Sequence, residues 1–384
     1  MRALTPLLLV GLSAVSPALA QSADPVDLLA EEALTIRAKY DESLPDNPER
    51  TCTEENVIVR KEWGSLSESE RVEYTNAVLC LLEEPSQLDP VEVPGARNRY
   101  DDFVAVHINQ TLGIHATGNF LTWHRLYVAA YEQALRNLCG YKGAQPYWAW
   151  NKYADDPINS PIFDGSPYSM SGNGAYIPHN DTIIQPPNIT LPAGQGGDCV
   201  MSGPFKDMVV NLGPLVSPLQ VPGSEPQEGN GLNHNPRCLR RDISEVAARD
   251  WTRTEDVMTL IQDNENVLLF QNMMQGDPRV GILGVHAGGH YTINGDPGAD
   301  FFASPGDPAF FLHHAMIDRT YWIWQNLDPA KRLSEVMGTI TVYNEPPSRN
   351  TTVDDVIELN NLADARRIGE LLDTTAGPLC YIYK

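Results

Sequence analysis

The stretch His286-Ala-Gly-Gly-His290, with Asp307-Pro-Ala-Phe-Phe-Leu-His313-His314-Ala-Met-Ile-Asp318-Arg319 after it, decides the fold of this chain. We predict one helix around Gly284 to Tyr291 and another around Pro308 to Asn326. Two histidines four residues apart project from one face of a helix, about one turn apart, and two such imidazoles suit one metal ion. A pair of this kind is weak evidence when it stands alone, and here His313 and His314 follow it.

A second group of histidines precedes this stretch in the chain. His107 ends a helical pattern that starts at Arg99, His115 lies in the loop from Gly113 to Gly118, and His124 lies early in the next predicted helix. Each of the two groups can therefore supply three imidazoles, which makes a metal site far more plausible than either group does alone.

The types of ligand narrow the choice of metal without fixing it. Di-iron helix bundles use carboxylate-rich ligand sets, blue copper sites need a thiolate, and catalytic zinc usually takes three protein ligands at a single site. Here the candidate ligands are all imidazole and come in two threes. Imidazole suits zinc, copper, iron and nickel, so the residues alone leave the metal open.

Two longer segments resemble the signatures of a known family. The segment His115-Ala-Thr-Gly-Asn-Phe-Leu-Thr-Trp-His124-Arg125, followed by Val128 and Glu132, resembles the copper-A signature of the tyrosinase, catechol oxidase and haemocyanin superfamily. The segment from Asp307 to Arg319, followed by Trp322, resembles its copper-B signature, and Tyr381-Ile-Tyr383 resembles the Tyr-x-Tyr that closes such catalytic domains. The resemblance implies a mainly α-helical fold with long disulfide-stapled loops and few short strands.

In such a fold a four-helix bundle holds a dinuclear centre of two copper ions. Carried over residue by residue, the family pattern makes three histidines ligands of each copper. The copper ligands would be His107, His115 and His124 for one ion, and His286, His290 and His314 for the other.

The family motif takes the second histidine of the adjacent pair as the ligand. Helix geometry agrees, because His314 and Asp318 share one face while His313 is rotated by roughly 100°. His313 is then either a residue that supports the site or faces the substrate, or a core histidine whose nitrogens are satisfied by hydrogen bonds.

Charged and aromatic residues near the site have structural explanations as well as functional ones. We expect Asp318 and Glu132 to form ion pairs with Arg125 and Arg319 as candidate partners. His179 and His234 are expected at the surface. The aromatic residues expected to form the hydrophobic wall of the bundle are Phe120, Trp123, Phe310, Phe311, Trp322 and Trp324.

The resemblance implies a copper oxidoreductase that uses O2 to oxidise o-diphenols (catechols) to o-quinones, with small phenols as substrates. The alternatives are a tyrosinase with monophenolase activity, an o-aminophenol oxidase and a non-enzymatic O2 carrier. In the family, monophenol hydroxylation is often associated with an Asn directly after the first copper-B histidine, and here that position is Ala287. Tyr291 and Phe301, which is expected above the second copper, would narrow the entrance. We therefore expect a catechol oxidase with weak or no monophenol hydroxylation.

Helical patterns also cover Val26 to Tyr40, Val72 to Leu82 behind a capping box at Ser67 to Glu70, Leu121 to Leu138, and parts of Ile243 to Met274. Between about Asp155 and Asn235 the sequence is rich in Pro, Gly, Asn and Ser, which predicts a long set of surface loops. Thr339 to Tyr343 has the Val/Thr/Tyr composition of a short strand.

The N-terminus reads as a secretory signal peptide over residues 1–20, with small residues before the expected cleavage site after Ala20. Export predicts three disulfides from six cysteines, with 15 possible connectivities. It also makes four sequons usable for N-glycans, at Asn109, Asn180, Asn188 and Asn350.

Residues 21–384 are expected to form a single catalytic domain, without the C-terminal lid domain of latent family members. The net charge of −23 argues against nucleic acid or anionic membranes as partners. No stretch of the mature chain approaches the roughly 20 apolar residues of a membrane span. The protein is thus expected to be secreted and extracellular.

Overall fold

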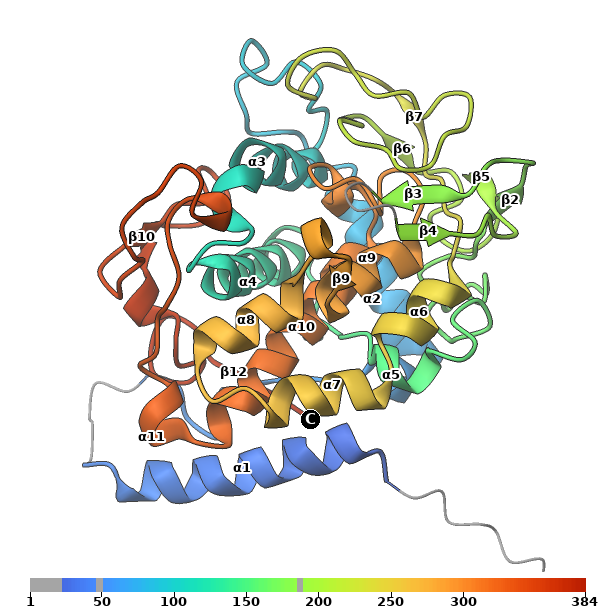
Figure 1. Ribbon diagram of the computed structural model, residues 1–384. Helices are drawn as coiled ribbons and strands as arrows, with labels where there is room; N and C mark the ends of the chain where they lie inside the picture. Colours follow the sequence, from blue (N-terminus) through green and yellow to red (C-terminus); the bar gives the residue numbers. More distant parts are fainter. Residues whose placement is uncertain (1–22, 46–50, 185–188) are drawn as a thin grey trace, which may run out of the picture.

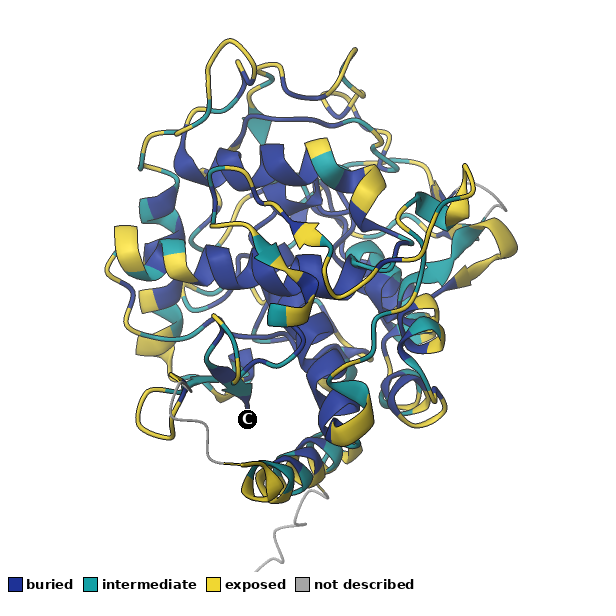
Figure 2. Ribbon diagram, turned by 90° about the vertical axis from the view of Figure 1, so that its left-hand side faces the viewer, coloured by how far each residue is buried: buried dark blue, intermediate teal, exposed yellow. Residues whose placement is uncertain are grey.

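All 18 residues of helix α10, Ala309–Asn326, are buried, which makes it the central helix of the fold (Figures 1 and 2). The structure is a computed structural model that describes residues 23–45, 51–184 and 189–384. A helix that is buried on every side needs neighbours all round it. The other α-helices are α1 (Pro25–Ser43), α2 (Glu68–Leu81), α3 (Arg99–Ile114), α4 (Phe120–Leu138), α5 (Trp150–Tyr153), α6 (Glu245–Trp251), α7 (Thr254–Gln262), α8 (Val267–Gln275), α9 (Val285–Ile293) and α11 (Pro329–Arg332).

Helices α4, α9, α1 and α7 all pack against α10, and α3 packs against α4. Helices α3, α4, α9 and α10 carry the two histidine groups, which confirms the predicted helix-rich fold with a central bundle. Helix α1 crosses the bottom of the view in Figure 1 and closes the lower end of α10. Arg37 of α1 is buried and joins it to the rest of the fold by bonds to Asn326 and Asp373.

The predicted helices begin where their capping residues stand. The side chain of Ser67 accepts from the backbone N–H of Glu70, and the Glu70 carboxylate accepts from the N–H of Ser67, which is the capping box expected from the sequence. Asn98 and Asp101 form a second capping box before α3. Helix α3 runs to Ile114, so His107, which was expected to end the helix, lies within it, and His115 caps it.

The strands are short and form only two-stranded pairings among the described residues. Strand β1 pairs in parallel with β12, so that the segment after α1 lies beside the C-terminal end of the chain. The strands are β1 (Ile58–Arg60), β2 (Gly174–Tyr176), β3 (Thr182–Ile184), β4 (Ile189–Leu191), β5 (Gly197–Val200), β6 (Val209–Val210), β7 (Arg237–Cys238), β8 (Gly276–Asp277), β9 (Ile282–Leu283), β10 (Val356–Ile357), β11 (Arg366–Arg367) and β12 (Tyr381–Tyr383). The 3-10 helices are η1 (Trp63–Ser65), η2 (Pro278–Val280), η3 (Ser304–Gly306), η4 (Val342–Asn344) and η5 (Ile368–Glu370).

Three disulfides close the fold, as predicted, and the structure selects their partners. The pairs are Cys52–Cys380, Cys80–Cys139 and Cys199–Cys238. The last of these fastens the loop-rich region, as expected. That region is less exposed than predicted, because side chains such as Phe163, Met170 and Phe205 are buried in the main core.

The strand expected over Thr339 to Tyr343 is wrong. Thr339 makes one isolated bridge with Asn350, and the following residues form the 3-10 helix η4 instead. The physical reason is the backbone at Tyr343 and Asn344, whose φ angles of 51° and 58° lie in the left-handed region and end an extended conformation. The segment turns back so that the N–H of Tyr343 donates to the carbonyl of Ala116.

None of the helices in the described ranges has the length and apolar character that crossing a membrane requires. The expected signal peptide lies outside the described residues. Of the four sequons, Asn109, Asn180 and Asn350 are exposed, and Asn188 also lies outside the described residues.

Candidate metal centre

The two histidine groups predicted from the sequence meet in the middle of the bundle. In the first group the ring centroids of His107, His115 and His124 lie 5.0 to 5.8 Å apart. In the second group those of His286, His290 and His314 lie 4.8 to 5.3 Å apart. The rings of His124 and His314 stack across the two groups with centroids 4.5 Å apart, so the groups form one continuous cluster.

Four of the six imidazoles are oriented by a hydrogen bond from one ring nitrogen to the backbone. Each of them places Nδ1 against a backbone carbonyl, which fixes the neutral tautomer with the proton on Nδ1 and leaves a lone pair on Nε2. The bonds are His107 to Phe302 O (2.7 Å), His115 to Thr111 O (2.9 Å), His124 to Phe120 O (2.9 Å) and His290 to Gly298 O (3.2 Å).

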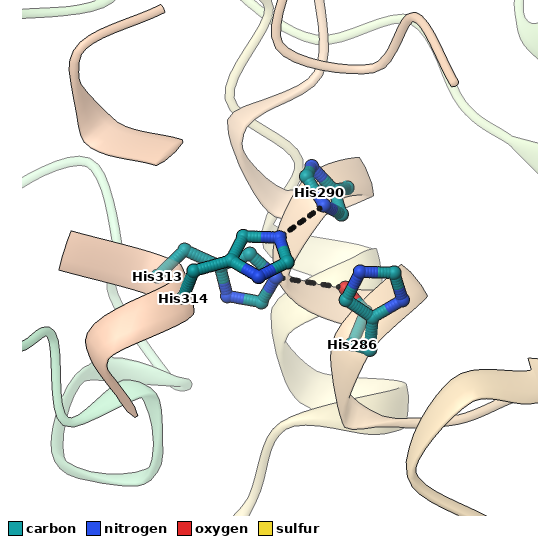
Figure 3. A group of neighbouring side chains, drawn as sticks. All are labelled: His286, His290, His313 and His314. Carbon is teal, nitrogen blue, oxygen red and sulfur yellow. Dashed lines mark hydrogen bonds between the residues drawn. The ribbon is translucent and has the colours of Figure 1, made fainter. Parts of the chain in front are cut away.

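Four ring nitrogens among the six imidazoles lack protein partners. Nε2 of His107, His124 and His286 and Nδ1 of His314 are buried with no hydrogen-bond partner among the described residues. Nε2 of His290 and Nε2 of His314 face each other at 3.2 Å (Figure 3). Buried polar atoms are normally paired, so several bare nitrogens within two clusters of imidazoles that could each hold a metal ion indicate bound cations. This donor set fits a pair of metal ions that accept imidazole ligands.

Burial keeps these imidazoles neutral, as metal ligands must be. Desolvation lowers the pKa of His115 to about 4 and the pKa of His290 to about 3. It also lowers the pKa values of His107, His124, His286 and His314 well below the ordinary value, with further lowering by neighbouring histidines.

His313 differs from the other histidines of the cluster because both of its nitrogens are used. The indole N–H of Trp150 donates to Nδ1 at 2.9 Å, and Nε2 donates to the carbonyl of His286 at 3.0 Å (Figure 3). A Cβ on Gly289 would collide with the His313 ring, so this imidazole fills the space beside α9. Of the two interpretations left by the sequence, the contacts favour a buried histidine with satisfied nitrogens.

Behind the histidines lies a buried group of charges around Asp318. Its Oδ1 accepts from Arg125 Nε at 2.6 Å, and its Oδ2 accepts from Arg60 and from the hydroxyls of Tyr381 and Tyr383. The predicted pair of Asp318 with Arg125 is therefore confirmed. The Tyr-x-Tyr of β12 belongs to the same group and ties the end of the described chain to α10.

The expected role of Arg319 as a partner of these carboxylates is wrong. Arg319 pairs with Asp27 of α1 at 2.8 Å, while Glu132 pairs with Arg60 at 2.6 Å. The guanidinium of Arg319 points away from these carboxylates and toward α1. Nothing in the sequence indicated that α1 packs against α10. Arg60 lies on β1, in no recognised motif, and was missed for that reason.

A cavity of about 120 Å³ opens beside the histidine cluster. His115, His286 and His290 line its inner end, together with the three further residues that the sequence singled out, Ala287, Tyr291 and Phe301. Phe301 was expected above the second copper. Its ring instead contacts the first histidine group, with its centroid 4.8 Å from that of His115. Burial raises the pKa of the Tyr291 hydroxyl to about 12, so Tyr291 is a neutral donor there.

The cavity contains one carboxylate that the sequence did not single out, Asp300. Its Oδ2 accepts the backbone N–H groups of Leu215 and Val216, and its Oδ1 accepts those of Phe302 and Ala303. Burial raises the pKa of Asp300 to about 6 even though these four bonds oppose the rise. A carboxylate offers about four lone-pair positions, so Asp300 has none left for a ligand.

The remaining histidines lie away from the cluster. His234 is exposed, as expected. The surface position expected for His179 is wrong, because its side chain is buried against Asp242 with 1% exposed. Both of its nitrogens face acceptors, the carbonyl of Ile177 and the carboxylate of Asp242, and this charge pair permits the burial.

Comparison with known proteins gives matches over most of the chain. A family model described as "Common central domain of tyrosinase" matches residues 97–327. Tyrosinase P of Aspergillus terreus is 41% identical over 330 residues, which cover 85% of this chain and 91% of the relative. An N-acetyl-6-hydroxytryptophan oxidase of Emericella nidulans is 40% identical over 348 residues, which cover 87% of this chain and 94% of the relative. The structure of a polyphenol oxidase variant from Thermothelomyces thermophila matches with a TM-score of 0.88 and 43% identity, covering 94% of this chain and 97% of the other.

Proposed function

This chain belongs to the tyrosinase family of copper oxidases, and we propose that it is a catechol oxidase, which oxidises o-diphenols to o-quinones with O2 and hydroxylates monophenols poorly. The observation that carries the narrower proposal is the lining of the metal-side cavity. Among the described residues that line it, Asp300 is the one carboxylate, and its lone pairs are already used by four backbone N–H groups.

We assign one copper to His107, His115 and His124, and the other to His286, His290 and His314. The support is the set of bare ring nitrogens described above, together with the backbone carbonyls that orient four of the rings. Bound copper supplies the binding of O2 and accepts the electrons of the diphenol. The protein positions the ligands and keeps the surroundings dry.

Proton transfer separates the two classes of substrate. A monophenol has a pKa near 10 and must lose its proton close to the metal, which calls for a positioned base or an ordered water. Ala287, next to ligand His286, has no donor or acceptor on its side chain to orient such a water. Tyr291 is neutral at physiological pH because its pKa is about 12, so it cannot serve as the base.

Oxygen uptake with tyramine and dopamine tests this proposal. We expect the copper-loaded protein to oxidise dopamine rapidly and tyramine about 10²- to 10⁴-fold more slowly, which is the usual contribution of a general base. Ala287→Asn should raise the tyramine rate specifically, because its amide could orient a water near His286. Comparable turnover of the two substrates by the unchanged protein would contradict the proposal.

We also propose that the protein is exported after removal of residues 1–20 and carries N-glycans. Three disulfides favour an oxidising compartment, and the sequons at Asn109 and Asn180 are exposed. Mass spectrometry of protein from the culture medium of a eukaryotic host should find an N-terminus near Gln21 and a mass that falls after glycosidase treatment. An intact N-terminus in a cell-retained protein would contradict export.

A further inference from the structure

A second and larger cavity adjoins the metal-side cavity. Its volume is about 590 Å³, within the range of pockets that hold whole small molecules, whereas the metal-side cavity has about 120 Å³. A buried cavity of about 150 Å³ holds one benzene ring. The metal-side cavity, at about 120 Å³, is no larger than this, so it accommodates at most a single ring, and a larger substituent on that ring must lie elsewhere.

Four residues form the border between the two cavities, namely Ala116, Gln275, Gly276 and Tyr343. The border is held in place from both sides. The N–H of Ala116 donates to Gln275 Oε1 at 2.7 Å, and its carbonyl accepts from the N–H of Tyr343 at 3.2 Å. These shared lining residues mark the place where a substituent of a ring bound near the metal would pass toward the larger cavity.

The larger cavity offers no free charge to a ligand. Asp277 and Arg279 are its charged lining residues, and they bind each other by two hydrogen bonds of 3.0 and 2.9 Å. The Arg279 guanidinium also stacks on the Tyr343 ring at 3.6 Å from its centroid. An ammonium or carboxylate group on a substrate would find no unpaired counter-charge here.

Two lining residues carry buried polar atoms that lack a partner. Gln271 is 2% exposed, and its Nε2 donates to the carbonyl of Met337 while its Oε1 is left without a partner. Thr351 is 5% exposed, and its hydroxyl oxygen is also unpartnered. Such atoms cost free energy unless a ligand or water bonds to them. Together they offer an acceptor and a hydroxyl donor, which a secondary amide satisfies with its N–H and its carbonyl.

We propose that the larger cavity is a distal subsite, and that the preferred substrates are o-diphenols extended by an uncharged substituent with a secondary amide. This inference rests on the proposed catechol oxidation and names its substrate class. The diphenol ring would stand at the copper pair, and the substituent would pass Tyr343 and Gln275 to reach Gln271 and Thr351.

The test compares N-acetyldopamine, which carries such an amide, with 4-methylcatechol, which has only the ring and a methyl group. We expect kcat/KM to favour N-acetyldopamine by about 5-fold or more, since one or two hydrogen bonds contribute about 0.5–1.5 kcal/mol each. Thr351→Val removes the unpartnered hydroxyl while keeping the shape, and should lower kcat/KM for N-acetyldopamine by about 2- to 10-fold. Thr351→Val should leave kcat/KM for 4-methylcatechol unchanged.

A bulky variant tests the space itself. Asn272 lines the cavity from an exposed position on α8, so Asn272→Trp should obstruct it and lower kcat/KM for N-acetyldopamine by about 10-fold or more. The matched control is Leu269→Trp, at a position of the same helix that is 46% exposed and does not line the cavity. Calorimetric titration with N-acetyl-3,4-dimethoxyphenethylamine, which cannot be oxidised, should show weaker binding to both subsite variants and unchanged binding to the control.

The outcomes separate this inference from the proposed function. If the copper-loaded protein oxidises neither catechol, the proposed function fails and the subsite fails with it. The distal subsite is refuted, while catechol oxidation stands, if 4-methylcatechol is oxidised and kcat/KM for N-acetyldopamine is no higher. It is also refuted if the variants lower kcat/KM equally for the two substrates.

Discussion

At the scale of single residues, His313 and His314 are chemically identical neighbours with opposite surroundings. His313 donates to one backbone carbonyl and accepts from one indole, so no lone pair is left for a metal. His314 keeps a buried nitrogen without a protein partner. The family signature takes His314 as the ligand by resemblance, and the contacts of His313 support that assignment. Trp150, which occupies His313, could not be predicted because it lies 163 residues away in the chain.

The pair yields a direct prediction about metal content. His314→Ala should reduce copper from two ions to one per chain and nearly abolish catechol oxidation. His313→Ala should retain two ions, because it removes no ligand, and should change the rate through the loosened carbonyl of His286. Elemental analysis of the purified variants after copper loading measures this. Equal copper loss in both would show that the wrong histidine of the pair was assigned.

Asp318 gives a second prediction at this scale. Burial alone would raise its pKa, but the charges of Arg125 and Arg60 and the hydroxyls of Tyr381 and Tyr383 outweigh burial and lower the pKa. A lowered pKa in the fold means that Asp318 contributes stability above its unfolded pKa of about 3.9, and that this contribution disappears as the pH falls through the folded pKa.

Asp318→Asn should therefore lower the free energy of unfolding at pH 7 by about 3–5 kcal/mol, since it leaves the buried Arg125 guanidinium without its anion, while Arg60 keeps its pair with Glu132. The difference in the free energy of unfolding between this variant and the unchanged protein should shrink below pH 4. Denaturant titrations at pH 7 and pH 3 measure it, with Asp364→Asn as the control because that side chain is 89% exposed. A loss of stability that is the same at both pH values would contradict the role given to this carboxylate.

At the scale of elements, the regular helices were predictable and the connections were not. One capping box and apolar spacing located the starts of α2, α3 and α4 within a few residues, whereas α3 runs past its expected end. The strand expected over 339–343 failed because Tyr343 and Asn344 adopt left-handed backbone conformations that composition does not reveal. That same turn places Tyr343 at the border of the two cavities, so the part of the site that sequence reasoning missed lies in a loop.

The loop-rich region depends on its disulfide and on buried ion pairs, among them the pair of Arg241 with Asp307. Cys199–Cys238 closes a separation of 39 residues, and Arg241 binds Asp307, just before α10, by two bonds of 2.8 and 2.7 Å. Replacing both cysteines by serine should cost about 2–4 kcal/mol of stability, because the unfolded chain gains freedom. Copper content should stay at two ions per chain, since no ligand lies in this region. Thermal unfolding and elemental analysis check both, and loss of copper at unchanged stability would contradict this account.

At the scale of the whole molecule, long-range contacts bring the chain together around one centre. Arg60 on β1 reaches Asp318 across 258 residues, and β12 pairs with β1. The local patterns of the sequence could single out the six histidines because they fall in two short groups, three of them within the two signature segments and His107, His286 and His290 close before those segments. They could not predict Arg60 or the second cavity, because those features exist only where distant segments meet.

The histidine cluster predicts that metal stabilises the whole fold. Bare nitrogens in the core cost free energy in the metal-free protein, and an ion that binds only the folded state stabilises it by about 4 kcal/mol at 1,000 times its dissociation constant. We expect a clear rise of Tm on copper loading and its reversal by a chelator. Calorimetric scans of both forms measure the shift, and an unchanged Tm with copper bound would contradict this coupling.

Anomalous X-ray scattering at the copper edge, from crystals of the copper-loaded protein, tests the central claim most directly. The account predicts two peaks within about 4 Å of each other, one bound by His107, His115 and His124 and the other by His286, His290 and His314. A single peak, or a peak bound by His313, would contradict it.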